Sequence, residues 1–384
     1  MFRFLTAGES HGPGLTAIIE GLPAGLVIDI DKLNDDLARR QQGFGRGGRM
    51  QIERDKAEVL SGLRFGQTLG SPLTLVVRNK DWVNWEDRMS ASGPPCGEIV
   101  TKARPGHADL TGVLKYKRQD VRDILERASA RETAARVAVG AIAKQLLAVC
   151  GIGITSHVTN IGGIGIKSGQ VDYDQVVALK EKSDLGCIEP DTEALMKKAI
   201  QESKEQGDTL GGIFEVLAVN VLPGLGSHVQ WDRRLDTCIA GLVMSIPAIK
   251  GIEFGAGFAY AALPGSQAHD EIFYNSGQGY YRNSNRAGGI EGGMSNGETI
   301  VVRAAMKPIP TLMKPLASVD ILTKQPVRAS TERSDVSAVT AAAVVGEAMV
   351  AIGLAKALLE KFGADCVDDL IAAIEYYRQR IAIG

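Results

Sequence analysis

Residues 336–362 read VSAVTAAAVVGEAMVAIGLAKALLEKF, and this stretch decides how the rest of the chain must be arranged. Its apolar side chains cover nearly every face of a helix, which is the pattern of a buried helix. Residues 132–150, ETAARVAVGAIAKQLLAVC, have the same character. Glu347 and Lys356 interrupt the longer run, which is also too mildly apolar for a membrane span. Two such helices predict a central helical layer that other elements cover.

Working outward, the covering elements are segments rich in valine, isoleucine and glycine. Strands are expected within residues 1–30, the last of them at 26–30, and at 50–54, 73–77, 152–166, 212–221, 252–258 and 299–306. A helix that Asp31 caps is expected to run to about Arg40, and amphipathic peripheral helices are expected at about 173–182, 190–205 and 367–380. Because strands and helices do not alternate strictly, the pattern favours an α+β fold over a doubly wound sheet.

No charged or proline-rich linker divides the chain, so residues 1–384 are predicted to form one domain. Three polar or glycine-rich stretches, at about 41–49, 80–120 and 264–297, are predicted to be functional loops.

Composition excludes several classes of protein. The formal net charge is −2 and the pI about 6.3, which disfavours a nucleic-acid binder. The cysteines are five in number, scattered and without a C-x-x-C pair, so we expect neither a metal site nor a disulfide framework. Residues 1–4 run directly into a folded segment with no charged region and apolar core before it. We therefore expect no secretory signal, no membrane association and a cytoplasmic location.

Two histidines are held in glycine-containing loops. His11 lies in GESHGPG, residues 8–14, and His107 lies in RPGHAD, residues 104–109. A histidine in such a frame has a constrained backbone and can exchange a proton near neutral pH. A surface turn is the alternative for each motif alone. His157 lies in an alternating strand and is expected to pack in the core.

Arginines gather around the glycines of residues 41–49, where Arg40, Arg46 and Arg49 are candidates for binding carboxylate or phosphate. A solvated basic face is the alternative. Residues 127–133, RASARET, lead into the first buried helix, where Ser129 and Glu132 form either a capping box or part of an anion site. Asp335 precedes the second buried helix and is expected at least to cap it.

Taken together and in order, these segments resemble those of the chorismate synthase family. The quoted motifs are joined by GLGSH, KGIEF, GGIEGGMSNG and RSDVSAV, and the resemblance covers nearly the whole chain. It implies a β-α-β sandwich in which sheets cover a central helical layer, and a homotetramer. It also implies a carbon–oxygen lyase that eliminates phosphate from 5-enolpyruvylshikimate 3-phosphate to give chorismate, with reduced FMN and no net redox change.

The resemblance also assigns roles to residues. His11 matches the acid that protonates the leaving phosphate, His107 the histidine beside the flavin, and Asp335 the acid that assists removal of the C6 proton. Arg40, Arg46 and Arg49 match the anionic side of the substrate, where Arg40 and Arg46 also match positions associated with NADP. The flavin shell corresponds to Arg127, Ala128, Ser129, Pro247, Ala248, Gly293, Lys307, Pro308, Ile309, Pro310, Thr311 and Arg333.

Two departures from the family pattern put side-chain contacts to the flavin in doubt. Pro247 stands where many relatives have asparagine, and residues 309–311 read IPT where many have TSS. No NAD(P)H reductase module is evident, so an external flavin reductase or NADPH as external reductant is expected. The alternatives are an FMN-dependent oxidoreductase that uses the same pocket, or a non-catalytic binder of phosphorylated ligands.

Overall fold

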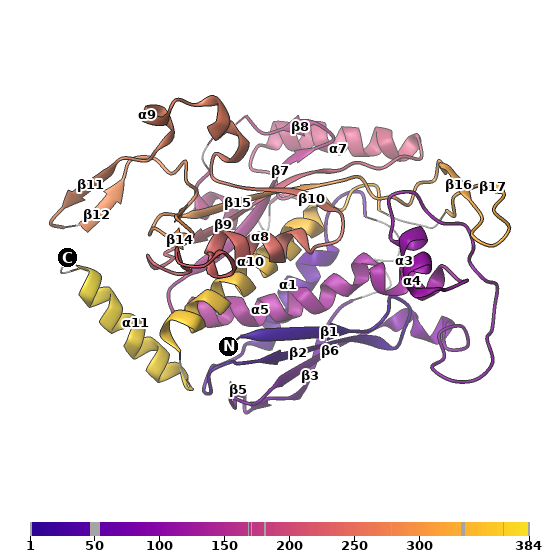
Figure 1. The fold of residues 1–384 in the computed structure, drawn as a ribbon, viewed down its shortest axis with the longest axis horizontal. Helices are drawn as coiled ribbons and strands as arrows, with labels where there is room; N and C mark the ends of the chain where they lie inside the picture. Colours follow the sequence, from indigo (N-terminus) through magenta and orange to yellow (C-terminus); the bar gives the residue numbers. More distant parts are fainter. Residues whose placement is uncertain are drawn as a thin grey trace.

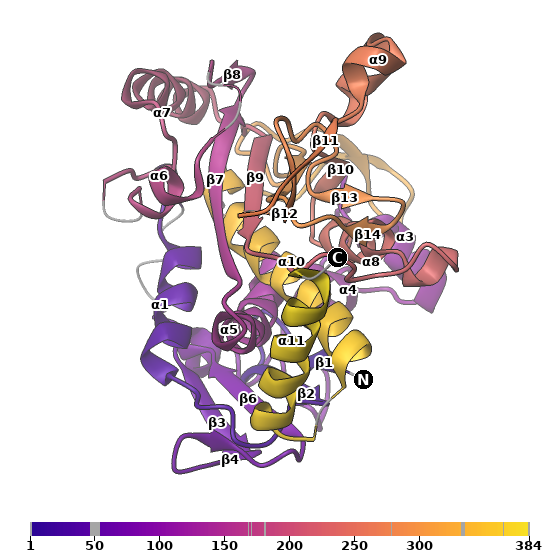
Figure 2. The ribbon, with the colours of Figure 1, turned by 90° about the vertical axis from the view of Figure 1, so that its left-hand side faces the viewer.

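Two antiparallel sheets enclose a central layer of helices (Figures 1 and 2). The computed structural model describes residues 2–46, 54–167, 169, 171–179, 182–277, 279–331, 335–363 and 365–382. In both views the four-stranded sheet lies below the helices and the five-stranded sheet lies above them. The predicted α+β sandwich, with buried helices between antiparallel sheets, is confirmed.

The smaller sheet has the strand order β1-β2-β6-β3, with every neighbouring pair antiparallel. Its strands are β1 Arg3–Ala7, β2 Gly14–Glu20, β3 Ala57–Ser61 and β6 Leu73–Arg78. Alternate residues of β2 and β6 are buried: Leu15, Ala17, Ile19, Leu73, Leu75 and Val77. Because side chains alternate between the faces of a strand, this period-two pattern turns one apolar face toward the helices.

The larger sheet has the order β10-β15-β9-β7-β8, also antiparallel throughout. Its strands are β7 Gly153–Ile161, β8 Ile164–Gly165, β9 Gly212–Val219, β10 Ile249–Phe254 and β15 Ile300–Met306. Phe214 of β9 is fully buried, and its ring lies where a Cβ on Gly346 would be, 2.3 Å from the nearest ring atom. The glycine therefore lets the helical layer approach this sheet closely.

The central layer is built from α5 Thr133–Val149 and α10 Val339–Phe362, with α1 Ile30–Gln41 beside them. α5 packs on the smaller sheet and α10 on the larger one, so each helix is covered on both sides. By length and composition alone α10 could cross a membrane, but 94% of its most apolar window is buried inside the fold. It is therefore the core helix that its sequence predicted.

A cluster of charges is buried where α1, α5 and α10 meet. Glu347 accepts hydrogen bonds from both Nη atoms of Arg39, at 3.0 and 2.9 Å, and from Oγ of Ser156 at 2.9 Å. The ammonium of Lys144 lies between Glu347 and Asp36. Burial alone would lower the pKa of Lys144, but these two carboxylates outweigh it and raise the pKa. The ion cluster thus fixes the relative positions of the three helices.

The remaining elements lie around this sandwich. Helices and 3₁₀ turns are η1 Lys80–Asn84, α3 Asp109–Tyr116, α4 Arg122–Ala128, η2 Ala130–Glu132, α6 Tyr173–Val177, α7 Pro190–Glu205, η3 Trp231–Arg233, α8 Leu235–Met244, η4 Gly257–Ala262, α9 Gly265–Ala268 and α11 Val367–Ala382. Short strand pairs are β4 Leu63–Arg64 with β5 Gln67–Thr68, β11 Ile272–Asn275 with β12 Gly279–Arg282, β13 Ile290–Glu291 with β14 Met294–Ser295, and β16 Ala317–Val319 with β17 Pro326–Arg328.

Several local predictions were wrong. The expected strand at 26–30 is irregular apart from one isolated bridge, and the helix after it begins at Ile30 with Asp29, not Asp31, as its N-cap. The predicted loop at 80–120 contains η1 and α3, and the loop at 264–297 contains α9 and two strand pairs. α8 was not predicted. Of the predicted strand at 50–54 and loop at 41–49, residues 47–53 lie outside the described residues.

Candidate active site

The loop between β1 and β2 carries His11 to the place where α4 ends. The backbone N–H of Ser10 donates to the carbonyl of Glu126 at 3.0 Å, and that of His11 donates to Oε2 of the same residue at 2.8 Å. On the other side of the loop, Nδ2 of Asn79 donates to the carbonyl of Gly12 at 2.7 Å. These contacts hold the backbone of the histidine from both sides.

The His11 ring is oriented by a carboxylate and an indole. Its Nδ1 lies 2.9 and 3.0 Å from the two carboxylate oxygens of Glu126, whose side chain is 2% exposed. The ring stacks on Trp85 with the centroids 4.0 Å apart. Burial would raise the pKa of Glu126, but its hydrogen bonds with His11 and the charge of Arg122 outweigh burial, and the pKa is lowered. Glu126 is therefore ionised at neutral pH.

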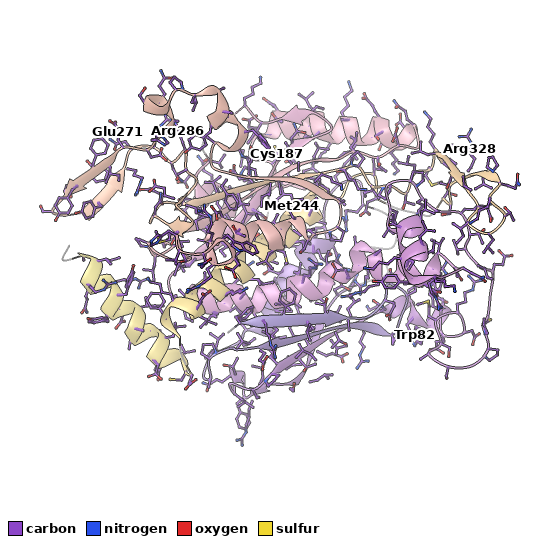
Figure 3. All side chains as sticks on the ribbon, in the orientation of Figure 1. Trp82, Cys187, Met244, Glu271, Arg286 and Arg328 are labelled. Atoms are coloured by element: carbon purple, nitrogen blue, oxygen red, sulfur yellow. The ribbon has the colours of Figure 1, made fainter. Side chains whose placement is uncertain are left out.

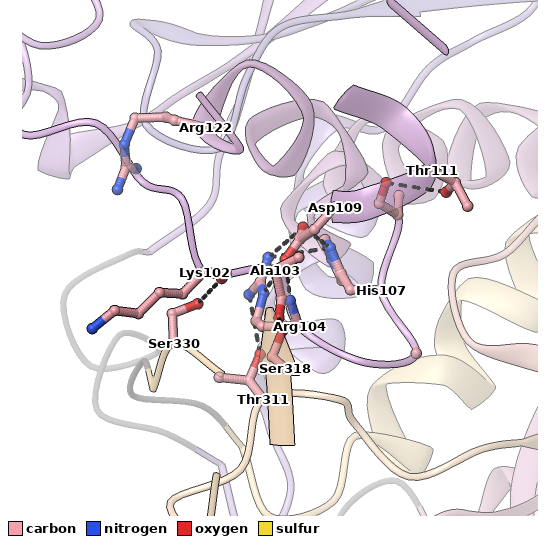
Figure 4. Close-up of polar contacts among 12 residues, drawn as sticks. Lys102, Ala103, Arg104, His107, Asp109, Thr111, Arg122, Thr311, Ser318 and Ser330 are labelled. Atoms are coloured by element: carbon pink, nitrogen blue, oxygen red, sulfur yellow. Dashed lines mark hydrogen bonds and ion pairs between the residues drawn. The ribbon is translucent and has the colours of Figure 1, made fainter. Parts of the chain in front are cut away.

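His107 has a similar arrangement (Figure 4). Its Nδ1 contacts Oδ1 of Asp109, which is fully buried. Arg104 donates to the same carboxylate from Nε at 2.9 Å and from Nη2 at 3.2 Å, and from Nη1 to Oγ1 of Thr311 at 3.2 Å. Burial would raise the pKa of Asp109, but His107 and Arg104 lower it to about 2. Asp109 is thus an anion at neutral pH and orients the ring.

The two supporting carboxylates come from neighbouring helices. Asp109 begins α3 and Glu126 lies in α4. α3 packs closely on α4 at Gly112, where an added Cβ would lie 2.3 Å from the Ile124 side chain. This helix pair lies at one end of the molecule, near Trp82 and far from Glu271 (Figure 3). The predicted catalytic histidines His11 and His107 are therefore held by one structural unit.

Buried guanidinium groups lie beside the His11 loop. Asp55 accepts from Nη2 of Arg40 at 2.7 Å and from Nη1 of Arg131 at 2.6 Å. The pKa of Arg40 is lowered. Burial has the largest effect and lowers it, Asp55 opposes this, and the charge of Arg131 lowers it further. Nε of Arg131 donates to Oδ1 of Asn79 at 2.9 Å, the same amide that holds the His11 loop. Two guanidinium groups are thus gathered around one carboxylate, and guanidinium groups are suited to binding an anionic ligand.

The segment that carries Arg46 contacts the segment that precedes α10. Nη1 of Arg46 lies 2.8 Å from Oδ2 of Asp335, so a predicted anion-binding residue contacts a predicted catalytic acid. Asp335 does not cap α10, whose N-cap is Ala338 without a side-chain hydrogen bond. The expected capping role was therefore wrong. Arg49 and Arg333 lie outside the described residues.

Part of the predicted flavin shell converges on the His107 loop. The ammonium of Lys307 contacts the carbonyl of Gly106, and the backbone N–H of Lys307 donates to the carbonyl of Ala248 at 3.0 Å. Pro310 also lies against Gly106, and Thr311 receives the hydrogen bond from Arg104. Oγ1 of Thr209 holds the carbonyl of Ile309 at 2.8 Å, and Pro308 lies between these anchored residues.

Lys307 has the character of an anion-binding residue. Burial lowers its pKa first, and the neighbouring charge of Lys250 lowers it further. Two nearby ammonium groups repel each other, and an anion placed between them would relieve that repulsion. A phosphate group is such an anion, so the pair suits a phosphorylated ligand.

The other predicted flavin residues lie in two further places. Ser129, next to Ala128, has its Oγ 3.1 Å from Oγ of Ser10. Arg127 donates from Nη2 to the carbonyl of Thr6 at 2.9 Å and from Nη1 to that of Gly8 at 3.1 Å. This group therefore adjoins His11.

Pro247 and Gly293 lie at opposite ends of α8. Pro247 comes shortly after the helix, whereas the carbonyl of Gly293 accepts from the N–H of Leu235 at its first residue. Ten helical residues span about 15 Å, so the helix keeps these two positions apart.

A cavity of about 720 Å³ adjoins the support of His11. Its lining includes the predicted flavin residues Arg127 and Ala128. Further charged residues line it as well, among them Glu9, Arg88, Arg118, Arg122 and Glu126. A second cavity, about 550 Å³, lies beside Arg39, His157 and Thr340, and none of the described predicted site residues lines it. His157 packs in the core as expected, with Nε2 3.0 Å from Glu215. The candidate site is therefore the region of the first cavity and the two histidine loops.

Sequence reasoning missed several residues that build this site. Arg131 and Arg104 stood inside quoted motifs but were not singled out, although buried partners now define them. Asp109 also stood inside one of these motifs, whereas Glu126 and Trp85 gave no clear signal. A glutamate within a charged helix resembles a solvated residue, and its partner His11 is 115 residues away in the chain.

Comparisons with known proteins identify the family of this chain. The family model described as chorismate synthase matches residues 2–359. A chorismate synthase of Moorella thermoacetica is 58% identical, covering 99% of this chain and 100% of its own, and one of Geobacter sulfurreducens is 56% identical, covering 99% of each chain. A structure titled "Crystal Structure of Chorismate Synthase" superposes with a TM-score of 0.81 at 46% identity, covering 100% of this chain and 99% of its own. The resemblance drawn from the motifs is thus confirmed, and the chain belongs to the chorismate synthase family.

Proposed function

We propose that this chain eliminates phosphate from 5-enolpyruvylshikimate 3-phosphate in an anti-1,4 sense and releases chorismate. Membership of the family makes it a lyase of aromatic amino-acid biosynthesis and implies a small-molecule substrate and a reduced flavin. The observation that carries the assignment of residues is Asn79, which hydrogen-bonds both the His11 loop and Arg131. An acid and a buried cation are thereby held together, as a departing phosphate requires.

The substrate side would be formed by guanidinium groups. The substrate carries one phosphate and two carboxylates, and guanidinium groups bind such anions in bidentate fashion. Arg40 and Arg131 are buried around Asp55, and Arg46 is buried against Asp335. We assign Arg40 and Arg46 to this side, with Arg49 following by resemblance. Their charges would neutralise the phosphate as it departs.

The reaction breaks two bonds of the substrate and needs two proton movements. The C–O bond to phosphate breaks, the C6–H bond breaks, and a new C=C bond completes the diene, so the oxidation state is unchanged. His11 donates a proton to the phosphate, and the carboxylate of Asp335 assists removal of the C6 proton. Bound reduced FMN supplies transient electron donation. His107, oriented by Asp109, would stabilise the anionic form of the reduced flavin.

The residues around His107 fit FMN. Lys307 with Lys250 supplies charge for a phosphate, the N–H of Lys307 is held by the carbonyl of Ala248, and the carbonyl of Ile309 is held by Thr209. The proline at 310 and the isoleucine at 309 restrict contacts there to backbone groups and Thr311. We propose further that FMN is reduced by an external reductase or NADPH, and that the enzyme is a cytoplasmic homotetramer.

The decisive experiment is an anaerobic assay of phosphate release with dithionite-reduced FMN. We expect phosphate and chorismate in equal amounts and many turnovers per flavin, with no activity on oxidised FMN. A yield that never exceeds one chorismate per flavin would contradict the proposal. Steady oxidation of NADPH in step with product would instead indicate an FMN-dependent oxidoreductase, and binding without turnover would indicate a non-catalytic binder.

A further inference from the structure

We propose that Glu126 is a positioning residue for His11, fixing which ring nitrogen carries the exchangeable proton and stabilising the protonated ring. The inference rests on the proposed function, in which His11 is the acid for the leaving phosphate. Glu126 lies at the Nδ1 edge of the ring, held by His11 and Arg122. It therefore acts through the histidine and does not need to touch the substrate.

The hydrogen bonds of Glu126 determine the tautomer of His11. Both carboxylate oxygens face Nδ1, and Oε2 also accepts the backbone N–H of His11 at 2.8 Å. An ionised carboxylate can only accept hydrogen bonds, so Nδ1 must be the N–H donor. The proton exchanged with a ligand is then carried by Nε2, on the opposite side of the ring. A carboxylate that orients a histidine in this way is a common element of acid–base sites.

The charges around the ring come from three parts of the chain. From α4, Nη1 of Arg122 donates to Oε1 of Glu126 at 2.7 Å. From the same loop as His11, the carboxylate of Glu9 folds back toward Gly12. From the segment after β6, Trp85 stacks on the ring, with Asp81 accepting from its Nε1 at 3.0 Å.

Two arginines complete these surroundings. Arg88 lies 5.8 Å from the centre of the Trp85 ring, and Arg131 is linked to the His11 loop through Asn79. Glu126 contacts the imidazole directly, with both carboxylate oxygens at its Nδ1. At this distance its negative charge favours the protonated ring over the neutral one.

Trp85 restricts the ring in a second direction. The indole covers one face of the imidazole at an interplanar angle of 29°, and Arg122 lies 4.8 Å from the centre of the same indole. A ring held by its Nδ1 edge and by one face has little freedom to rotate. Nε2 is consequently presented in one direction, which keeps the proton at a constant position for transfer.

The test is Glu126→Gln, which keeps the size of the side chain and removes its charge. Without the anion, the protonated ring is less stable, so activity that needs this form is lost at lower pH. We expect the alkaline limb of the kcat/KM profile to move down by about one pH unit, with a loss of about ten- to a hundredfold at neutral pH. Glu126→Asp keeps the charge and should restore much of the wild-type profile.

The matched control is Glu215→Gln, which changes the same residue type in the other buried histidine–glutamate pair. His157 and Glu215 lie in the larger sheet, away from the predicted site, so the control should alter stability but leave the pH profile unchanged. An independent readout is ring NMR of the ligand-free protein, in which His11 is one of five histidines. We expect its ring to titrate at lower pH in Glu126→Gln.

Arg122→Gln provides the opposite electrostatic change. Removing this cation should move the alkaline limb of the kcat/KM profile to higher pH. If Glu126→Gln does not fold, this shift in Arg122→Gln tests the role of Glu126 in its place. Unchanged alkaline limbs and unchanged His11 titration in the folded variants would overturn the inference. The proposed function would stand in that case, provided that His11→Gln is still slow. Normal turnover of His11→Gln would instead overturn the role of His11 itself.

Discussion

Asp55 lies in front of the Arg131 guanidinium, and its two carboxylate oxygens accept from Nη1 at 2.6 and 2.7 Å. The same carboxylate binds Arg40, and all three side chains are at most 4% exposed. One anion thus holds two cations that reach the site from α1 and from the turn before α5. The arginines are positioned before any ligand arrives.

Asp55→Asn should be strongly destabilising because it leaves two buried guanidinium groups facing each other without their anion. We expect a loss of about 3–5 kcal/mol in the free energy of unfolding. Urea unfolding followed by circular dichroism measures it. Glu58→Gln is the control. Glu58 pairs with Arg78 within the smaller sheet, but both of these side chains are about half exposed. That change should cost less than about 1 kcal/mol, and equal effects would contradict the argument.

The central helices and most strands could be predicted because their signals are local. Alanine and valine on every face of 336–362 can only be buried, and no distant residue changes that conclusion. The wrong prediction of a strand at 26–30 shows what such local signals leave out. Leu26 and Ile28 are buried while Val27 is 64% exposed, so the alternation is real, but the segment has only one bridge, to Gln67. The alternation of apolar residues predicts which side chains are buried, whereas a strand also needs a neighbouring strand to which it can hydrogen-bond.

Only part of the candidate site could be predicted from the sequence, because some of its contacts are not local. Histidines in glycine-framed loops stand out within a few residues of sequence. The residues that orient them are Asp109, which is only two residues from His107, and Glu126, which lies in the charged helix α4. Its contact with His11 depends on how α4 packs at the end of the smaller sheet. Such long-range contacts leave no pattern in the sequence near either partner.

Gly140→Ala should destabilise the protein although alanine favours a helix. A Cβ on Gly140 of α5 would lie 2.2 Å from Cβ and 2.5 Å from Cα of Ala348 on α10, so the two helices would have to separate. We expect a loss of about 1–3 kcal/mol in the free energy of unfolding. Thermal and urea unfolding measure this effect.

Gly241→Ala is the control for this helix crossing. Gly241 lies in the exposed part of α8, and an added Cβ would meet no atom within 4 Å. Here the substitution should stabilise the protein by up to about 1 kcal/mol. If Gly140→Ala were also stabilising, the close crossing of α5 and α10 would be wrong.

Asp109 should make stability depend on acid pH. Its folded-state pKa is about 2, below the value of 3.8 for a free aspartate, so its contribution is fully present above about pH 4. It is lost as the pH falls from about 4 to about 2, because the folded protein must then protonate a carboxylate that His107 and Arg104 hold as an anion. The difference in unfolding free energy between wild type and Asp109→Asn should therefore shrink over this range. A difference independent of pH from 5 to 2 would show that the charge of Asp109 is not what stabilises the loop.

His11→Gln and His107→Gln should both slow turnover but for different reasons, which spectroscopy can separate. Losing a proton donor typically costs on the order of a hundred- to ten-thousandfold, and His11 is assigned that role at the phosphate. His107 adjoins Gly106, which contacts Lys307 of the proposed flavin site, so only its replacement should also change the absorbance of bound reduced flavin. His157→Ala is the control: its ring is buried against Glu215 in the larger sheet, so it should cost about 1–3 kcal/mol of stability and leave turnover per folded enzyme unchanged. Single-turnover kinetics with reduced-flavin spectra distinguish the three variants. Identical flavin spectra in His11→Gln and His107→Gln would remove the distinction between phosphate-side and flavin-side histidines.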